Sequence, residues 1–281
     1  MRTWFVTGAS RGFGFEIARQ ALEQGDNVVA TARRPEEIGA ALTSDRLLAL
    51  PLDVTDEAAA QRVVDAAVDR FGGIDVLVNN AGRGLLGAVE EASDAEVRAV
   101  YDTNVFGLLA VTRAVLPVLR RQRAGRVINI SSIGGFASSQ GWGIYNSTKF
   151  AVEGLSEALR IELAPLGIDV TIVEPGMFRT RQAIQRSLDG SSLHTAGTVI
   201  EDYADTAGQT RGRPAEYNQR QQGDPAKAAA AIITVATAEK PPLRVQLGAD
   251  SVARVEAKLA QVADELAQWR DLAVSTAYEE Q

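Results

Sequence analysis

Three residues have the types and the spacing that proton chemistry needs: Tyr145, Lys149 and Ser132. Tyr145 and Lys149 stand four positions apart near the start of a predicted helix, Gly143–Ala164, so they share one face of that helix. Ser132 comes thirteen residues before Tyr145, at the end of a predicted strand, Arg126–Ser131. Tyrosine has an ordinary pKa near ~10, and a neighbouring ammonium group favours the phenolate and lowers that pKa. The pattern therefore predicts an acid–base centre at Tyr145.

A glycine-rich loop follows the first predicted strand, Thr3–Thr7, and leads into a predicted helix, Gly12–Gln24. Glycine permits a tight turn and the close approach of a pyrophosphate, while a helix start offers free N–H groups and the positive end of its dipole. The glycine spacing is G-x-x-x-G-x-G. We expect this loop to bind a dinucleotide through Gly8, Ser10, Arg11, Gly12, Phe13 and Gly14.

The end of the second predicted strand, Asn27–Ala32, indicates which dinucleotide is bound. Enzymes that use NAD place Asp or Glu there to hold the ribose 2′-OH, but here Ala32 occupies that position and Arg33 follows. A guanidinium can clamp a 2′-phosphate with two hydrogen bonds, and Arg11 could reach the same phosphate from the other side. We therefore predict NADP(H) rather than NAD(H). The alternative is that Arg33 and Arg34 form a solvated loop.

Short apolar runs alternate with helical patterns along the chain, which predicts βαβ units with right-handed crossovers. The first six runs are nearly continuous in apolar residues, as expected for a parallel sheet covered on both faces. The predicted strands are Thr3–Thr7, Asn27–Ala32, Leu47–Leu52, Ile74–Asn79, Arg126–Ser131, Ile168–Glu174 and Leu243–Leu247; the predicted helices are Gly12–Gln24, Asp56–Phe71, Asp94–Arg123, Gly143–Ala164 and Ala226–Ala238.

Taken together, these pieces resemble the short-chain dehydrogenases/reductases of the compact, non-extended branch. The resemblance covers about residues 3–180, and the fold should extend to about residue 250. It implies one domain, residues 1–281, with a doubly wound Rossmann α/β fold: a seven-stranded parallel sheet with helices on both faces. The matching pieces, in the expected order and spacing, are Thr7–Gly14, Asn79-Asn80-Ala81-Gly82, Asn104, Ser132, Tyr145, Lys149 and Pro175-Gly176.

The resemblance implies an NADP(H)-dependent oxidoreductase that interconverts a ketone or aldehyde and an alcohol by hydride transfer. Tyr145 would be the general acid in reduction and the base in oxidation, and Ser132 can hydrogen-bond the carbonyl oxygen. Carried over from the family, Lys149 would bind the hydroxyls of the nicotinamide ribose. Asn104 would keep a water in a proton relay from Lys149 to solvent.

The resemblance also places residues that follow the third, fourth and sixth strands around the cofactor. They are Asp53 and Val54 at the adenine, Asn80, Ala81 and Gly82 at the adenosine ribose, Pro175 and Gly176 at the switch-point crevice, and Phe178 and Thr180 at the carboxamide.

Residues 177–223 contain scattered Gly, Ser, Thr and Gln with little periodicity, and such a stretch inside a compact domain is usually functional. We expect a substrate lid of short helices, the alternative being an insertion without a role. This stretch contains the single histidine of the chain, His194. It either occupies an ordinary surface or core position or takes part in substrate binding. Aromatic residues predict an apolar or aromatic substrate. The expected pocket is Ser132, Phe136, Trp142, Tyr145, Phe178 and Tyr203.

The segment 249–281 predicts an amphipathic helix and a tail, a layout that resembles the steroid- and retinol-dehydrogenase-like members. Many tetrameric relatives in this family end earlier, with a glycine-rich segment packed against a neighbour. We therefore expect a homodimer through the long helices Asp94–Arg123 and Gly143–Ala164, with a tetramer as the alternative.

The amino-acid composition limits the classes of molecule that this protein can bind. The 281 residues carry 29 Lys and Arg against 36 Asp and Glu, a net charge of −7, which argues against nucleic acid and anionic membranes. With no cysteine and one histidine, disulfides, thiolate metal sites and paired-histidine metal motifs are excluded, and we expect no metal. Neither a signal peptide nor an apolar run of membrane length is evident, so we expect a cytoplasmic protein acting on a small molecule.

Two other functions compete with this interpretation. One is a non-catalytic NADP(H)-binding sensor or scaffold, which would not need Ser132, Tyr145, Lys149 and Asn104 together. The other is sugar-nucleotide epimerase or dehydratase chemistry, whose enzymes use a different glycine spacing and usually a longer substrate domain.

Overall fold

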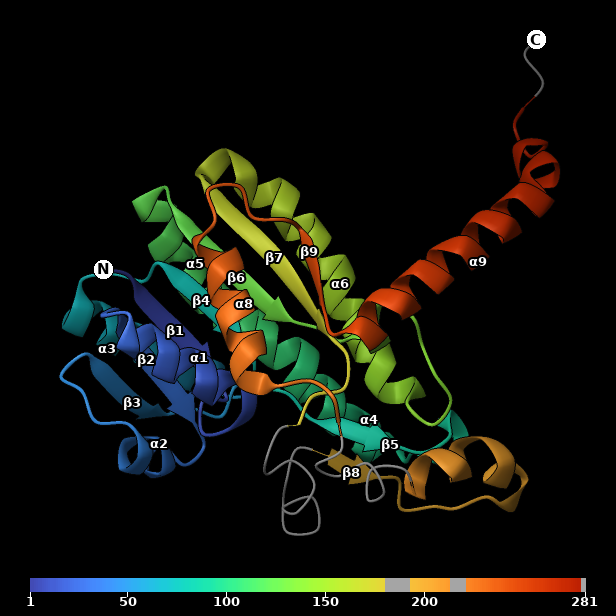
Figure 1. Cartoon of the computed structure of the whole chain (residues 1–281), viewed down its shortest axis with the longest axis horizontal. Helices are drawn as coiled ribbons and strands as arrows, with labels where there is room; N and C mark the ends of the chain where they lie inside the picture. Colours follow the sequence, from blue (N-terminus) through green and yellow to red (C-terminus); the bar gives the residue numbers. More distant parts are fainter. Residues whose placement is uncertain (180–192, 213–220, 279–281) are drawn as a thin grey trace.

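The computed structural model describes residues 1–179, 193–212 and 221–278 and is built on a seven-stranded, wholly parallel sheet (Figure 1). The strand order is β3-β2-β1-β4-β6-β7-β9, so the order reverses beside β1. Nearly every residue of β1, β2, β4, β6 and β7 is buried, which explains their continuous apolar sequences. The strands are β1 (Thr3–Thr7), β2 (Asn27–Ala32), β3 (Leu47–Pro51), β4 (Val76–Asn79), β6 (Gly125–Ile130), β7 (Ile168–Pro175) and β9 (Arg244–Leu247).

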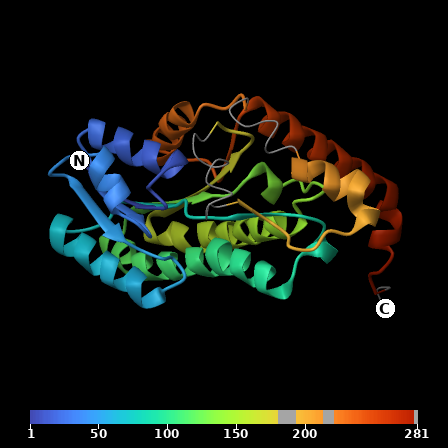
Figure 2. The ribbon, with the colours of Figure 1, turned by 90° about the horizontal axis from the view of Figure 1, so that it is seen from below.

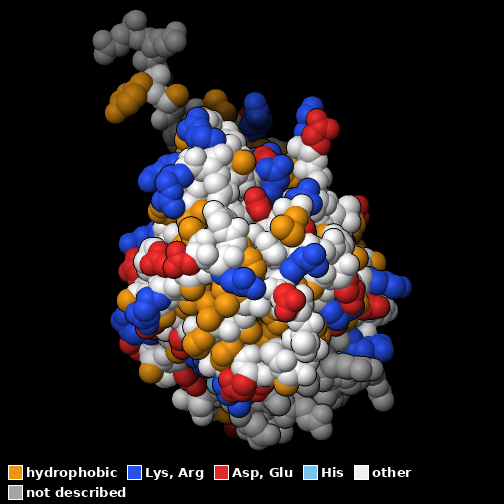
Figure 3. Space-filling view, turned by 90° about the vertical axis from the view of Figure 1, so that its left-hand side faces the viewer, with side chains coloured by type: hydrophobic (Ala, Val, Ile, Leu, Met, Phe, Trp, Pro, Cys, Tyr) orange, Lys and Arg blue, Asp and Glu red, His pale blue; other side chains and the backbone are white. Residues whose placement is uncertain are grey.

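Helices cover both faces of this sheet, as expected. On one face α1 (Gly12–Glu23) and α8 (Pro225–Thr237) pack on each other and on the strands; on the other lie α3 (Glu57–Phe71), α5 (Leu108–Gln122) and α6 (Gly143–Leu163) (Figure 2). A short helix, α2 (Glu36–Ala41), was not predicted. On the face shown in Figure 3, acidic and basic side chains are interspersed around a group of hydrophobic ones.

Helix boundaries follow local capping chemistry. The Asp56 side chain accepts a hydrogen bond from the backbone N–H of Ala59 and begins α3, whereas Gly72, at a φ of +82°, ends it. In the same way the carboxylate of Asp224 accepts from the N–H of Ala226 at the start of α8.

The single helix predicted over Asp94–Arg123 has three parts. They are α4 (Asp94–Tyr101), a π-helical turn (Asp102–Gly107) and α5. Among the described helices, this stretch is long and apolar enough to cross a membrane by length and composition, but 61% of its most apolar window is buried inside the molecule. Such burial is what a core helix shows, because it packs on the sheet.

The segment expected to be a substrate lid is described only in part. It contributes β8 (Leu193–Thr195), which pairs in parallel with β5 (Gly84–Leu86), followed by a 3₁₀ turn (Glu201–Tyr203) and a π-helical turn (Ala204–Gly208). The prediction of short helices thus missed a strand that docks on the segment after β4. After β9 the chain ends in a long helix, α9 (Ala249–Val274).

Candidate active site

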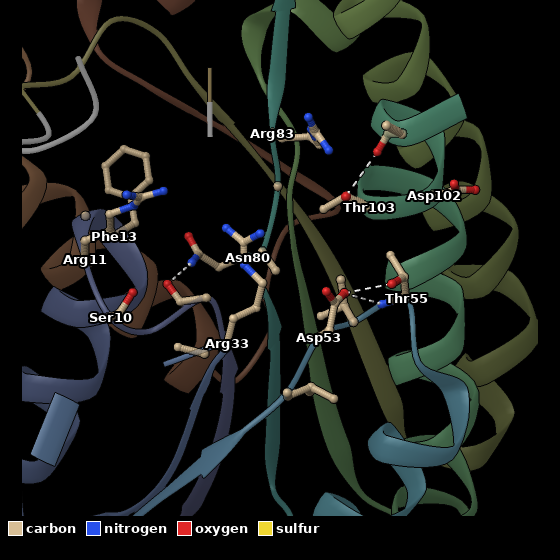
Figure 4. A pocket seen from close by; sticks show the side chains of 18 of the residues that line it. Ser10, Arg11, Phe13, Arg33, Asp53, Thr55, Asn80, Arg83, Asp102 and Thr103 are labelled. Atoms are coloured by element: carbon tan, nitrogen blue, oxygen red, sulfur yellow. Dashed lines mark hydrogen bonds between the residues drawn. The ribbon is translucent and has the colours of Figure 1, made fainter. Parts of the chain in front are cut away.

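A cavity of about 630 Å³ opens where the chain leaves the carboxyl ends of β1, β2, β3 and β4 (Figure 4). It has the size of a typical small-molecule or cofactor site. The structure brings eleven of the predicted cofactor residues together in its wall: Gly8, Ser10, Arg11, Gly12, Phe13, Arg33, Asp53, Val54, Asn80, Ala81 and Gly82.

The glycine loop is held against the segment that follows β4. The side-chain amide of Asn80 donates to the carbonyl oxygens of Thr7 and Gly8, at 2.8 and 3.1 Å. The Thr7 hydroxyl accepts from the backbone N–H groups of Asn80 and Ala81. Gly8 has a φ of +65°, and a Cβ at Gly14 would lie 2.5 Å from the Asn80 amide nitrogen. Both glycines are therefore required by the close packing of these two segments.

The beginning of α1 faces this cavity. Its N-cap residue, Arg11, is extended and makes no side-chain capping hydrogen bond, and Gly12 and Phe13 line the wall. A helix start of this kind offers N–H groups and a positive dipole end to an anion. The loop, the helix start and the cavity volume fit the pyrophosphate of a dinucleotide.

Arginine side chains enter the cavity from three separate segments: Arg11, Arg33 and Arg83 (Figure 4). Burial lowers the pKa of Arg83, and the nearby charge of Arg33 lowers it further. The neighbouring Arg34 instead pairs with Glu37 at 3.0 Å on the surface. The end of β2 contributes Ala32 to the cavity wall and no carboxylate. The carboxylate of Asp53, which follows β3, accepts hydrogen bonds from the N–H and hydroxyl groups of Thr55.

Sequence reasoning missed several residues of the cavity wall. Arg83 directly follows the predicted Asn80-Ala81-Gly82, so its position along the chain was a usable signal. His194 reaches the wall because β8 pairs with β5, a contact between distant segments that no local pattern predicts. The other residues not predicted are Ala32, Leu52, Thr55, Ala99, Asp102 and Thr103.

Tyr145 and Ser132 meet at the start of α6, as predicted. Their hydroxyl groups are hydrogen-bonded, and the Ser132 oxygen also accepts from the N–H of Gly134 at 3.1 Å. Burial raises the pKa of Tyr145 above its ordinary value, and the Ser132 hydrogen bond opposes that rise. The expected lowering of the Tyr145 pKa by Lys149 is not found: burial is the larger influence, and Ser132 is the group that opposes it.

Lys149 lies one helical turn further along α6 and is buried. Its ammonium nitrogen donates to the carbonyl oxygen of Ile130 at 2.8 Å and lies 5.7 Å from the centre of the Tyr145 ring. Burial lowers the pKa of Lys149 to about 8, opposed by the charge of Glu153. The lysine therefore changes protonation state not far above neutral pH.

Asn104, in the π-helical turn, joins the cavity to this group. Its amide oxygen accepts from the N–H of Arg83, and its amide nitrogen donates to the Arg83 carbonyl and the Thr148 hydroxyl. Gly82 lies between the two parts of the site. A Cβ there would stand 3.4 Å from the Asn104 oxygen and 3.8 Å from the Lys149 nitrogen.

The predicted cofactor residues Pro175, Gly176 and Phe178, at the end of β7 and after it, do not line this cavity. The N–H of Gly176 donates to Leu247, the N–H of Met177 donates to the carboxylate of Asp250, and the rings of Phe178 and Phe13 meet edge-on at 5.1 Å. Phe178 also forms a parallel bridge with Gly223. Thr180, expected at the carboxamide, lies outside the described residues.

The aromatic residues expected to line the substrate pocket make contacts at different places in the structure. Trp142 meets Tyr145 edge-on at 5.5 Å, and Phe178 packs on Phe13. Phe136 caps the 3₁₀ turn that follows Ser132. The Tyr203 hydroxyl donates a hydrogen bond to the carboxylate of Glu90 at 2.6 Å, and this contact is exposed to solvent.

Three carboxylates hold residues 193–212 to the body of the molecule: Glu90, Glu91 and Glu96. Glu91 is buried and accepts from the N–H groups of Ala88 and Ile200 and from Arg211. Burial alone would raise its pKa, but these hydrogen bonds lower the pKa of Glu91 to about 2. Glu96 accepts from the N–H of Gly197 at 2.9 Å.

Known proteins show the same organisation. A family model described as short chain dehydrogenase matches residues 2–189. An oxidoreductase of Botryotinia fuckeliana, BOA17, is 37% identical over 281 residues, 98% of this chain and 99% of that protein. A 3-ketodihydrosphingosine reductase of Bacteroides thetaiotaomicron is 39% identical over 86% of each chain.

A solved structure extends this similarity over the whole molecule. The short-chain dehydrogenase from Streptomyces avermitilis is 44% identical, with a TM-score of 0.89 and 99% of each chain covered. The matched family model includes the glycine loop and the Ser132–Tyr145–Lys149 group. The chain belongs to the short-chain dehydrogenase family and is an oxidoreductase.

Proposed function

We propose that this protein is an NADP(H)-dependent oxidoreductase that interconverts a ketone or aldehyde and the corresponding alcohol. The observation that carries the proposal is the contact between two parts of the site. The Ser132–Tyr145–Lys149 group, in which Lys149 is buried, is joined through Gly82 and Asn104 to a cavity that fits a dinucleotide. The proposal includes the domain organisation. The whole chain, residues 1–281, forms one domain, and residues 177–223 form its substrate lid.

The chain's own residues manage the oxygen of the substrate. The nicotinamide cofactor supplies the hydride to the carbonyl carbon in reduction and accepts it in oxidation. Tyr145 donates its hydroxyl proton to the carbonyl oxygen in reduction, and its phenolate takes that proton back in oxidation. Ser132, already hydrogen-bonded to Tyr145, donates a hydrogen bond to the same oxygen and positions it.

The residues around Tyr145 keep its hydroxyl group protonated and resupply the proton that it donates. The raised pKa of Tyr145 keeps the hydroxyl protonated near neutral pH, which suits the reductive direction. Lys149 binds the nicotinamide ribose and, with Asn104, passes a proton toward solvent through a water. A positive charge on Lys149, and that of the oxidised cofactor, would favour the phenolate that oxidation needs.

The charges of the cavity support NADP(H). Ala32 takes the position where an NAD enzyme carries a carboxylate for the 2′-OH, and Arg33, the next residue, lines the cavity. Arg11 stands in the glycine loop. Arg83 adds a third cation near Arg33, and together they favour a ligand that carries several phosphate charges.

The substrate is proposed to be apolar or aromatic. Trp142 offers an apolar surface beside Tyr145, and Phe178 offers another beside Phe13, a residue of the cavity wall. The name of one relative, 3-ketodihydrosphingosine reductase, denotes the reduction of a ketone.

We propose that the protein acts in the cytoplasm and forms a homodimer through α5 and α6. Phe106, Phe150 and Ile161 of this region are exposed, Ile161 by 75%.

Replacing Tyr145 tests the reaction directly. We expect Tyr145→Phe to lower kcat by roughly 10²–10⁴-fold while NADPH binding survives, because only the transferable proton is lost. The measurement is NADPH consumption with a panel of aldehydes, ketones, steroids and quinones, beside NADPH binding by fluorescence. Tyr101→Phe is the matched control, since it loses a hydroxyl that donates to Ser147 on α6 but lies outside the reacting group.

The two variants separate the competing functions. Unchanged turnover in Tyr145→Phe would show that the acid–base assignment is wrong. A wild-type protein that binds NADPH but consumes none with any compound would favour the sensor or scaffold instead.

Replacing Arg33 tests the cofactor. We expect Arg33→Ala to weaken NADPH binding by about 10- to 100-fold with little effect on NADH, because a charge-assisted hydrogen bond contributes about 1.5–3 kcal/mol. Titration of both cofactors gives the two dissociation constants. Arg34→Ala is the control, because its partner is Glu37 at the surface. Equal weakening of both cofactors would contradict the preference for NADP(H).

A further inference from the structure

The long helix α9 leaves the body of the molecule and exposes an apolar stripe. It has 26 residues, which makes it about 39 Å long, and its C-terminal part projects outward (Figure 1). Every residue from Leu259 to Val274 is exposed. Among them Leu259, Leu266 and Trp269 are 54%, 60% and 58% exposed. Large apolar side chains in such a row mark an interaction surface.

The apolar residues of α9 repeat with a spacing of seven. Two sets alternate at intervals of three and four, which is the pattern of a coiled-coil seam. The first set is Val252, Leu259, Leu266 and Ala273, and the second is Val255, Val262 and Trp269. A partner helix is what such a seam fits.

The base of α9 is fixed to the body, so its direction is set. The Asp250 carboxylate accepts from the N–H of Met177 at 2.7 Å, and the Ser251 hydroxyl donates to the Glu174 carbonyl at 2.8 Å. One turn later Arg254 donates to the carbonyl oxygen of Ser138. The rest of the helix is presented outward as a rigid rod.

We infer that α9 pairs with α9 of a second copy of this chain as an antiparallel two-stranded coiled coil. The charges beside the seam select this arrangement. If Leu259 lies against Val262 of the other copy, Glu256 comes beside Arg270 and Lys258 beside Glu265, each twice. All four contacts join opposite charges.

Other occupants fit α9 less well. A parallel pair would bring Glu265 beside Arg270 but would leave Glu256 and Lys258 facing uncharged residues. A membrane surface selects helices rich in Lys and Arg, whereas α9 carries five acidic residues against three basic ones. The α9 seam lies on a different element from the proposed α5–α6 dimer face. The α9 pairing is separate from that face and does not depend on the proposed reaction.

Charge reversal tests the pairing in solution. We expect Glu256→Arg to weaken the α9 association at least tenfold and to halve the mass in analytical ultracentrifugation, because it brings two arginines together. Arg270→Glu should do the same, and the double variant should restore the wild-type mass. Asp264→Arg is the matched control, since it makes the same change of charge on the side of α9 away from the seam. NADPH binding and circular dichroism check that each variant is folded.

Cross-linking tests the direction. The chain has no cysteine, so a single one can be introduced without background. In the antiparallel pair Ala263→Cys faces its own copy and is joined by a short bis-maleimide, whereas Ala273→Cys is not. Joining at Ala273 and not at Ala263 would establish the parallel pair and overturn the inference. A wild-type mass for all charge variants, or no joining at either position, would also overturn it.

Discussion

Lys149 lies beside Tyr145 and is buried, and burial disfavours its charge. Its nitrogen is held by the Ile130 carbonyl, and burial lowers its pKa to about 8, so the ammonium form is complete only below about pH 7. Tyr145 remains protonated throughout that range because its pKa is raised. The lysine, not the tyrosine, is then the group whose titration is felt near neutral pH.

This difference predicts the pH dependence of reduction. We expect kcat/KM for carbonyl reduction to be level at low pH and to fall as the pH rises through about 8, where Lys149 loses its proton. Removing the charge of Glu153, which supports the ammonium form, should move this fall to lower pH. The measurement is the pH profile of Glu153→Gln beside the wild type.

A neighbouring carboxylate supplies the control. Both Glu153 and Glu157 form ion pairs with Arg244, but it is the charge of Glu153 that raises the pKa of Lys149. Glu157→Gln should leave the profile in place. A profile that moves equally in both variants would assign the effect to Arg244 instead.

At this scale the sequence predicted that Ser132, Tyr145 and Lys149 come together, but it did not predict the directions in which burial shifts the pKa values of Tyr145 and Lys149. The spacing of Tyr145 and Lys149 on one helix face is a local property, so it could be read directly. The direction of the Tyr145 pKa depends on burial by segments distant in the sequence. His194 was missed for a related reason, because it reaches the cavity only through the pairing of β8 with β5.

Among the elements, the segment 193–212 depends most on a few side chains. Glu91 receives the N–H of Ile200 and the guanidinium of Arg211 in a buried setting. Because these bonds lower its pKa to about 2, their stabilising contribution is complete above about pH 4.5 and is lost as the pH falls toward 2.

Replacing Glu91 should therefore loosen this segment. We expect Glu91→Gln to increase amide hydrogen exchange at Ile200 and neighbouring residues, because unpaired buried groups cost about 1–3 kcal/mol. The exchange at β1 should not change. Glu90→Gln is the control, since its contact with Tyr203 is exposed. Equal protection of Ile200 in wild type and Glu91→Gln would show that the buried carboxylate does not hold the segment.

The sheet could be predicted from the sequence because each strand carries its own apolar signal. All seven strands were found to within two residues at each end, and α1, α3, α6 and α8 nearly as closely. The elements that were missed have no such signal. The helix α2 has six residues, and β5 and β8 have three each and are stabilised by pairing with each other. The π-helical turn lies inside an unbroken helical pattern and could not be distinguished from it.

For the whole molecule, the proposed α5–α6 dimer can be tested apart from α9. We expect Ile161→Glu to halve the mass of the assembly, because it places a charge in an apolar contact. Combined with Glu256→Arg, it should give a single chain. Val199→Glu is the control, since Val199 is similarly exposed but lies on the segment 193–212. An unchanged mass for Ile161→Glu would remove this face from the assembly.

The attachment of α9 decides how far the chain can be shortened. The sequence predicts that the family fold extends only to about residue 250, which invites a truncated protein that stops after β9. Such a truncation would leave the N–H of Met177 without its acceptor and the carbonyl of Glu174 without its donor, at the point where the chain leaves β7. A truncation after Val255 would keep both bonds and remove only the projecting rod. The functional boundary of the catalytic unit therefore lies inside α9, about two helical turns after its first residue.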